Sequence, residues 1–265
     1  MTDWVIRETR EEDEDTLAAL WHRVFGDPEE LSRGFLTQLP SLGGGVCAEK
    51  DGILLGAAYA VTDYFLKDER LAYLYAIAVL PEARGRGIGR TLTREAATLG
   101  RRLGAGIVCT VPAERSLYPW YERAIGVRCA LRQRTERIES CPGPVPQPLS
   151  PEDYGVRRER LLAGRPHVRL GAAVLRQEQF NCRVCGGDLL AVGGAIAAAY
   201  RERELTVVRE LLAPEGTECR TLAAALGASL GTEAVLLRTS DEAGEPFMAA
   251  DRPMPKGCLW NLALD

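Results

Sequence analysis

Residues 71–103 read LAYLYAIAVLPEARGRGIGRTLTREAATLGRRL, and this stretch decides the fold. Leu71 to Val79 are almost all apolar or aromatic, which predicts a strand that is covered on both faces. Pro81 has no N–H group for strand pairing and ends that strand. Further on, apolar residues recur at steps of three and four, which predicts an amphipathic helix with Ile88, Leu92, Ala96, Leu99 and Leu103 on its buried face.

The loop between this strand and helix contains three glycines, at positions 85, 87 and 89. Glycine lets backbone N–H groups approach a ligand closely, because no Cβ stands in the way. The start of a helix leaves up to four N–H groups without partners and binds anions, above all phosphates. Residues 84–102 also hold six arginines and one acid, in a chain whose net charge is −4. A local basic cluster in an acidic protein predicts a small phosphorylated ligand rather than nucleic acid.

The spacing of Arg84, Gly87 and Gly89 fits the pattern R-x-x-G-x-G. A dinucleotide fingerprint would need glycine where Arg90 stands, and no P-loop motif is present. The pattern resembles the acyl-CoA-binding signature of the GNAT superfamily of N-acyltransferases. The residues alone leave open an ordinary surface turn rich in glycine and arginine.

Composition narrows the class of protein. The chain has 265 residues, enough for one large or two ordinary domains. No apolar run reaches the ~18 residues that span a bilayer, and the acidic first residues do not read as an export signal, so we expect a cytoplasmic protein without a membrane partner.

The eight cysteines are therefore expected to be reduced. Cys182 and Cys185 form a lone C-x-x-C; a zinc-binding module stays an alternative, but we predict no metal because such a site usually has four ligands.

Residues 1–140 are predicted to form one α/β domain with a mixed sheet. The expected strands are 4–7, 46–49, 53–65, 71–79, 106–111 and 126–138; the expected helices are 11–25, 29–39, 88–103 and 113–124. Gly43 to Gly45 are expected to form a turn, and Lys50-Asp51-Gly52 a hairpin turn. This order of elements is similar to the GNAT acyl-CoA N-acyltransferase fold.

Residues 141–151 contain five prolines and predict a stiff linker. Residues 152–265 are expected to form a smaller domain, a degenerate GNAT-like one, with a helix at 151–163, a strand at 168–175, a hairpin of 189–201 with 205–212, a helix at 221–230 and a strand at 234–239. Its loop 213–218 has one glycine and two acids, a poor phosphate site. The resemblance is to tandem members of the family with one functional CoA site, and an unrelated α+β domain stays open.

The resemblance implies which residues bind acetyl-CoA. The pantetheine arm would pair with the backbone of Ile77, Ala78 and Val79, and the pyrophosphate would meet the N–H groups of the loop, namely Arg84, Gly85, Arg86, Gly87, Ile88, Gly89 and Arg90. Tyr121, in the run LYPWYERAIG, matches the tyrosine that protonates the leaving thiolate in the family, with Tyr118 as a substitute. Glu114 stands where the family often has an asparagine that contacts the cofactor, which puts that contact in doubt.

The acceptor of the acetyl group is expected to be a primary amine of a small molecule or a peptide. Asp27 follows the first helix, where the family shapes its acceptor site, and its carboxylate would attract a cationic amine; a helix cap is the alternative reading. The other carboxylates considered as a base are Asp63, Glu49 and Glu82. The predicted function is an acetyl-CoA-dependent N-acetyltransferase, and a non-catalytic acyl-CoA sensor is the alternative. The oligomeric state stays open, with a homodimer among the options.

Overall fold

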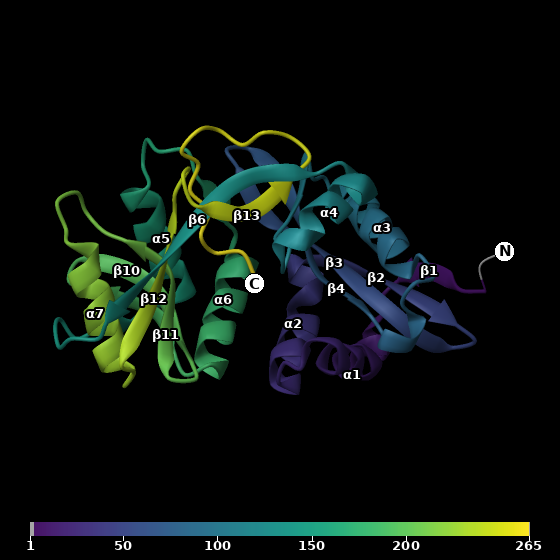
Figure 1. Ribbon diagram of the computed structural model, residues 1–265, viewed down its shortest axis with the longest axis horizontal. Coiled ribbons are helices and arrows are strands. Elements are labelled where there is room, and N and C mark those ends of the chain that lie inside the picture. Colours follow the sequence, from purple (N-terminus) through teal and green to yellow (C-terminus); the bar gives the residue numbers. More distant parts are fainter. Residues whose placement is uncertain (1–2, 265) are drawn as a thin grey trace. The chain divides into compact units, whose positions relative to one another are not determined.

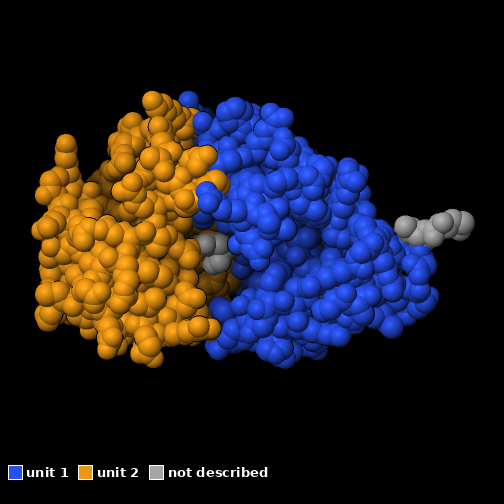
Figure 2. Space-filling view, viewed as in Figure 1, with its two compact units in different colours: residues 1–130, 247–254, 265 blue, residues 131–246, 255–264 orange. Residues whose placement is uncertain are grey.

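The computed structural model describes residues 3–264, and the contacts of the chain divide it into two compact units (Figure 2). Unit 1 holds the residues up to Ala130 together with Phe247–Met254, and unit 2 holds Leu131–Pro246 and Pro255–Leu264. We call Phe247–Met254 the return segment, because the chain comes back to unit 1 there. This division differs from the expected boundary at residues 141–151, because that proline-rich stretch falls inside unit 2.

The sheet of unit 1 is mixed, as predicted. Its strands lie in the order β1 (Val5–Glu8), β2 (Gly43–Lys50), β3 (Ile53–Leu66), β4 (Glu69–Val79), β5 (Ile107–Thr110) and β13 (Glu245–Ala250). β4 and β5 are parallel and are joined by a helix, whereas the pairs β1–β2, β2–β3, β3–β4 and β5–β13 are antiparallel. The β2–β3 hairpin turns at Asp51 and Gly52, both at positive φ, as the sequence indicated.

Helices cover both faces of the unit 1 sheet (Figure 1). On one face, α1 (Glu14–Phe25) and α2 (Glu29–Leu42) bring the rings of Trp21 and Phe35 onto Tyr59 and Tyr75, with centroids 5.1–5.8 Å apart. On the other face, α3 (Ile88–Arg102) packs closely because Gly100 has no side chain; a Cβ there would lie 2.4 Å from the Cβ of Ala72. α4 (Tyr118–Ile125) lies beside α3, and the short 3-10 turns η1 (Glu11–Asp13), η2 (Pro81–Ala83) and η3 (Arg115–Leu117) complete the unit.

The turn predicted at Gly43 to Gly45 is wrong, because these residues begin strand β2. They pair with Val61, Ala60 and Tyr59 of β3. A Cβ at Gly43 would lie 2.0 Å from the carbonyl oxygen of Ala60, and a Cβ at Gly45 would lie 2.8 Å from the Tyr59 ring. The glycines are thus needed for close approach within the sheet and do not mark a reversal of the chain.

The strands of unit 2 lie in the order β6 (Arg128–Glu139), β12 (Ala234–Ser240), β11 (Leu205–Leu212), β10 (Ala195–Glu202), β9 (Asp188–Val192) and β7 (Gln147–Pro148). Its helices are α5 (Pro151–Leu161), α6 (Ala172–Val184) and α7 (Cys219–Ser229). The strand predicted at 168–175 is wrong beyond β8 (Val168–Leu170). Gly171 has extended backbone angles and caps α6, whose strong helix formers, such as Ala172, Ala173 and Leu175, favour a helix there.

The two units share a succession of elements. In unit 1 the antiparallel strands β2, β3 and β4 are followed by α3 and by β5, which is parallel to β4. In unit 2 the antiparallel strands β9, β10 and β11 are followed by α7 and by β12, which is parallel to β11. The third strand of each series also carries a register shift against its antiparallel neighbour. The likeness therefore extends to an irregularity inside the strand.

Candidate functional site

Strand β4 continues past the end of β5 and leaves part of its edge open. β5 pairs with β4 only from Leu71 to Leu74, whereas β4 runs on to Val79. On the other edge, Ala76 and Ile77 fall in a register shift between the pairs Tyr59–Tyr75 and Ala57–Ala78. Ala76 has φ of 45°, a left-handed conformation that costs a residue with a Cβ about 1 kcal/mol. A bulge at this point re-aims backbone groups, and an extended ligand can pair with them.

The glycine loop presents a row of backbone donors. Gly85 and Gly87 have φ of 79° and 80°, and a Cβ at either would meet nothing within 4 Å, so the space beside them is open. Gly87 is the N-cap of α3, and no side chain caps that end. The hydrogen bonds of residues 3–264 include none from the N–H groups of residues 85–90. Successive unpaired N–H groups at a helix start form a binding site for phosphate oxygens.

Three of the loop and helix arginines are fixed by backbone carbonyls. Arg84 Nε donates to Val79 O at 3.2 Å, and Arg94 Nε donates to Ala124 O at 2.9 Å. Arg90 Nη2 donates to Arg123 O at 3.3 Å, so it too ties α3 to α4. Arg86 is exposed and makes no hydrogen bond or ion pair with any residue of the described part of the chain. No other residue therefore holds its guanidinium, which can turn to an anion, whereas Arg84 and Arg90 each use one nitrogen on a carbonyl.

Tyr121 lies on α4 and is buried against three neighbouring strands. It forms one buried cluster with Ala249 of β13, Ile77 of β4 packs against that cluster, and the Tyr121 phenol interacts with Thr110 of β5. Burial raises the pKa of the Tyr121 phenol, and the Thr110 side chain opposes that shift by a smaller amount. The phenol therefore stays protonated at neutral pH and can act as a proton donor. The structure brings Tyr121 together with Ile77, one of the predicted cofactor contacts.

Two further residues of this site escaped the sequence prediction. Trp120 stands edge-on to the Tyr121 ring, with centroids 4.8 Å apart, and a Cβ at Gly89 would lie 3.9 Å from its indole. It thereby links the glycine loop to the tyrosine. Thr110 also donates a hydrogen bond to Leu74 O at 3.0 Å, where β4 and β5 part. Trp120 had a signal in its position next to Tyr121, whereas Thr110 had none beyond ending a buried strand.

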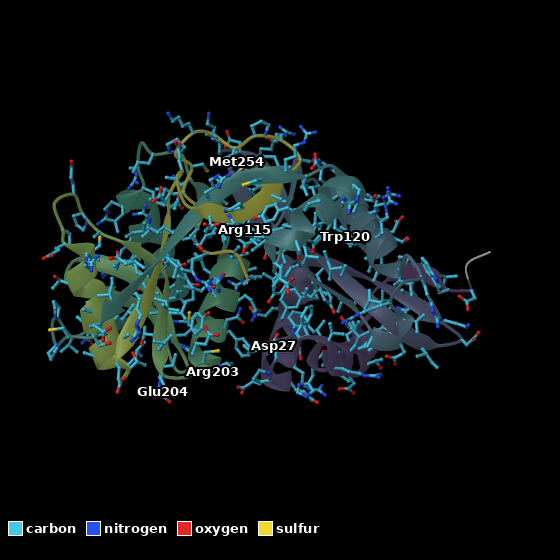
Figure 3. The ribbon with its side chains drawn as sticks, in the orientation of Figure 1. Asp27, Arg115, Trp120, Arg203, Glu204 and Met254 are labelled. Atoms are coloured by element: carbon cyan, nitrogen blue, oxygen red, sulfur yellow. The ribbon has the colours of Figure 1, made fainter. Side chains whose placement is uncertain are left out.

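Asp27 lies between α1 and α2 and does not cap a helix (Figure 3). Its Oδ2 accepts a hydrogen bond from Trp21 Nε1 at 2.8 Å, and its carbonyl oxygen lies 2.6 Å from His22 Nδ1. The Trp21 ring also contacts Tyr75, two residues before Ile77 on β4. A half-buried carboxylate is thus held on the aromatic face of the same strand whose end is open.

The other carboxylates that the sequence suggested have different roles. Glu49 Oε2 accepts from Arg7 Nε at 2.6 Å, and Glu82 forms an exposed ion pair with Arg23. Glu114 is exposed and accepts from Ser116, so the structure gives it no contact with the loop. These contacts make Asp27 a stronger candidate for an amine-binding group than Glu49 or Glu82, and Asp63 is half-buried on β3.

Unit 2 contains no comparable phosphate site at the corresponding place. Between β11 and α7, Gly216 has φ of 81°, but Glu215 and Glu218 put negative charge where a phosphate would lie. Cys182 is buried on α6, and Cys185 is half-buried at its C-cap. Within residues 3–264, no group of three His, Cys, Asp or Glu side chains is placed to hold a metal ion. In the same range, every helix is too short or too polar to cross a bilayer.

A sequence model of the Acetyltransferase (GNAT) family matches residues 4–127, which include β4, the glycine loop, α3 and Tyr121. A comparison with curated proteins finds no match.

Solved structures are similar over nearly the whole chain. A probable N-acyltransferase from Enterococcus faecalis V583 is 14% identical, covers 94% of this chain and 72% of its own, and has a TM-score of 0.69. A GCN5-related N-acetyltransferase from Kribbella flavida is 16% identical over 94% of this chain and 70% of its own, with a TM-score of 0.67. A putative acetyltransferase from Pyrococcus horikoshii is 14% identical over 98% of this chain and 96% of its own, with a TM-score of 0.65. At such identities the similarity establishes the fold.

Proposed function

From the match of residues 4–127 to the Acetyltransferase (GNAT) family, we propose that the chain is an acetyl-CoA-dependent N-acetyltransferase. The observation that carries the proposal is the row of unpaired N–H groups at residues 85–90, next to the open end of β4. A phosphate ester with a long extended arm fits both features. Acetyl-CoA has this form, with a pyrophosphate at one end and a thioester at the other.

The proposed placement of acetyl-CoA uses mainly backbone atoms. The pyrophosphate accepts hydrogen bonds from residues 85–90, with Arg86 as the cation that adds charge. The pantetheine arm lies along the open edge of β4 at Ile77, Ala78 and Val79. The thioester then ends beside Tyr121, because Ile77 and Tyr121 are in one packed cluster.

In the proposed reaction, a neutral primary amine attacks the carbonyl carbon of the thioester. The new C–N bond forms, the C–S bond breaks, and the sulfur leaves with the electron pair. Tyr121 donates its phenolic proton to that thiolate, and the phenolate regains a proton from the nitrogen through solvent. Burial keeps the donor protonated, because the pKa of Tyr121 is raised.

We place the acceptor amine on the aromatic face of β4, near Asp27. Trp21 fixes Oδ2 of Asp27, which leaves Oδ1 able to accept from an ammonium group. Acetyl transfer requires that the amine lose this proton before attack. Asp27 is therefore proposed to attract and orient the acceptor.

We propose that unit 2 is a second GNAT-like domain without a cofactor. The shared succession of strands and the parallel pair β11–β12 support this reading. The acidic loop between β11 and α7 supports the loss of the phosphate site. The proposed acetyl-CoA domain is thus unit 1, including the return segment, and the proposed structural domain is unit 2; these replace the expected ranges 1–140 and 152–265.

The test combines cofactor binding with turnover. Acetyl-CoA is titrated calorimetrically into wild-type protein and Tyr121→Phe, and CoA release is quantified by chromatography with spermidine, 2-phenylethylamine and trialanine amide as acceptors. We expect both proteins to bind acetyl-CoA with the same Kd within about twofold, and Tyr121→Phe to lose roughly 10²-fold or more in kcat. A wild-type protein that does not bind acetyl-CoA contradicts the proposal. Binding without turnover on any acceptor favours the acyl-CoA sensor.

A further inference from the structure

The return segment adds a strand to unit 1 next to β5. Ala249 of β13 lies opposite Thr110, and Ala250 lies opposite Cys109. Met248, Ala249 and Ala250 are at most 3% exposed. Without these residues, β5 would be an edge strand with unpaired backbone groups on the side away from β4.

Several contacts fix the return segment in place. The N–H of Asp251 donates to Val108 O at 3.0 Å, and the N–H of Val108 donates to Asp251 Oδ1 at 3.1 Å. Arg101 of α3 forms an ion pair with the same carboxylate, whose side chain is 19% exposed. One residue further, Arg252 pairs with Glu69 of β4 at 3.0 Å. The contacts of Asp251 and Arg252 therefore fix the register of the return segment against β5.

Ala249 belongs to the same buried cluster as the proposed proton donor, Tyr121. Because residues opposite each other on paired strands project to the same face, Ala249 and Thr110 stand side by side under α4. Ala249 is fully buried in one cluster with Tyr121 and Val127, and Ile77 packs against that cluster from β4. Tyr121 thus shares one packed cluster with Ala249 of β13 and Ile77 of β4, and its phenol interacts with Thr110 of β5.

We propose that Ala249 is a positioning residue for Tyr121, through which the last part of the chain sets the geometry of proton donation in unit 1. This inference rests on the proposed role of Tyr121. In this proposal, the small methyl group of Ala249 leaves room for the Tyr121 ring to reach Thr110. A larger side chain at position 249 displaces the Tyr121 phenol from the thioester sulfur of acetyl-CoA. Any change that displaces the return segment changes turnover and leaves the phosphate loop intact.

The test compares Ala249→Val with Ala250→Val in the full chain. Ala250 is on the same strand but lines a hollow of about 700 Å³ with Arg128 and Met254, so a valine there has room and does not press on Tyr121. We expect Ala249→Val to lower kcat about 10- to 100-fold with an unchanged Kd for acetyl-CoA, because misplacing a reacting group by about 1 Å has that order of effect. Ala250→Val is expected to stay within about twofold of wild type in both quantities.

A double-mutant cycle separates positioning from general damage. In a Tyr121→Phe background, Ala249→Val is expected to lower kcat by less than about twofold, because the group it displaces is gone. A loss in that background as large as in wild type overturns the proposal, and so does an unchanged kcat in the single variant. If Tyr121→Phe alone keeps wild-type kcat, the tyrosine's role in the proposed function is what fails.

A third measurement, ¹⁹F NMR, does not depend on turnover. 3-Fluorotyrosine placed at position 121 reports its surroundings through its ¹⁹F chemical shift. We expect Ala249→Val to move that resonance and Ala250→Val to leave it in place; equal shifts, or none, contradict the proposal. Should Ala249→Val not fold, Ala249→Ser with Ala250→Ser as control gives the smaller change at the same two positions.

Discussion

The indole N–H of Trp21 donates a hydrogen bond to Oδ2 of Asp27, with 2.8 Å between the two atoms. Asp27→Asn keeps an oxygen acceptor for Trp21 and removes the negative charge. If Asp27 attracts a cationic amine, this variant is expected to raise KM for spermidine about tenfold and to leave the Kd for acetyl-CoA unchanged. Steady-state kinetics with spermidine checks the prediction, and Glu29→Gln, on the exposed start of α2, is the matched control. A Glu29→Gln effect as large as that of Asp27→Asn would point to general surface charge.

The conformation of Gly87 allows a second prediction with a matched control. Gly87 and Gly104 have φ of 80° and 91°, and a Cβ at either meets nothing within 4 Å. Alanine at each position is therefore expected to cost a similar ~1 kcal/mol in stability from backbone strain. Only Gly87→Ala also puts a methyl group beside the phosphate loop, so it alone is expected to weaken acetyl-CoA binding, by about tenfold or more. Calorimetric titration of acetyl-CoA into both variants measures this difference. Equal Kd values would contradict the proposed placement of the cofactor at the glycine loop.

The sequence predicted the part of the site that is local along the chain. The apolar run 71–79, the three glycines and the spacing from Ile88 to Leu99 each indicate their own conformation, and β4, the loop and α3 lie where these signals place them. The positive φ of Gly85 and Gly87 also agrees with the choice of glycine, because other residues rarely adopt it.

What the sequence did not predict depends on contacts between distant residues. The run EPFMAA at 245–250 alternates too little to mark a strand, and its pairing with β5 follows only from the fold. The hydrogen bond from Trp21 to Asp27 and the burial of Tyr121 on Ala249 are contacts of the same kind. At Gly43 to Gly45, a local signal was misleading. Three glycines in a row are typical of a turn, but here they are needed for close packing against β3.

The ion pair of Arg7 with Asp13 gives a prediction on acid stability. Arg7 donates to both carboxylate oxygens at 2.6 and 2.8 Å, and this hydrogen bonding holds the pKa of Asp13 below its usual value. A carboxyl with a lowered pKa in the folded state stabilises the protein above its unfolded pKa of ~3.9, and this stability is lost as pH falls through the folded value. Asp13→Asn is therefore expected to cost about 1 to 3 kcal/mol at pH 7 and less at pH 3.

Urea unfolding of both proteins at pH 7 and pH 3 measures this difference. Asp15→Asn is the control, because the Asp15 side chain is 86% exposed and its pair with Arg33 is expected to contribute at most ~1 kcal/mol. A deficit of Asp13→Asn that stays constant from pH 7 to pH 3 would show that the ionised carboxylate is not the stabilising form.

The core of unit 2 contains a buried ion pair whose removal should cost far more. Arg158 donates to both oxygens of Glu210, at 2.9 and 3.1 Å, and the hydroxyl of Tyr154 donates to Glu210 at 2.9 Å. The two charged side chains are each 1% exposed. Arg158→Met leaves the carboxylate buried with only the tyrosine as donor, so we expect a loss of about 3 to 5 kcal/mol. Arg157→Met, on the exposed side of the same helix, is expected to change stability by less than ~0.5 kcal/mol.

A second substitution tests whether the unpaired charge causes that loss. Glu210→Gln in the Arg158→Met background keeps an acceptor for Tyr154 and removes the buried charge, so we expect it to restore more than half of the lost stability. Scanning calorimetry of the three variants measures this directly. Acetyl-CoA binding at 25 °C should stay at the wild-type level as long as unit 2 is folded, because the phosphate loop and open strand belong to unit 1. Loss of binding in a fully folded Arg158→Met protein would show that unit 2 contributes to the cofactor site and is more than a structural domain.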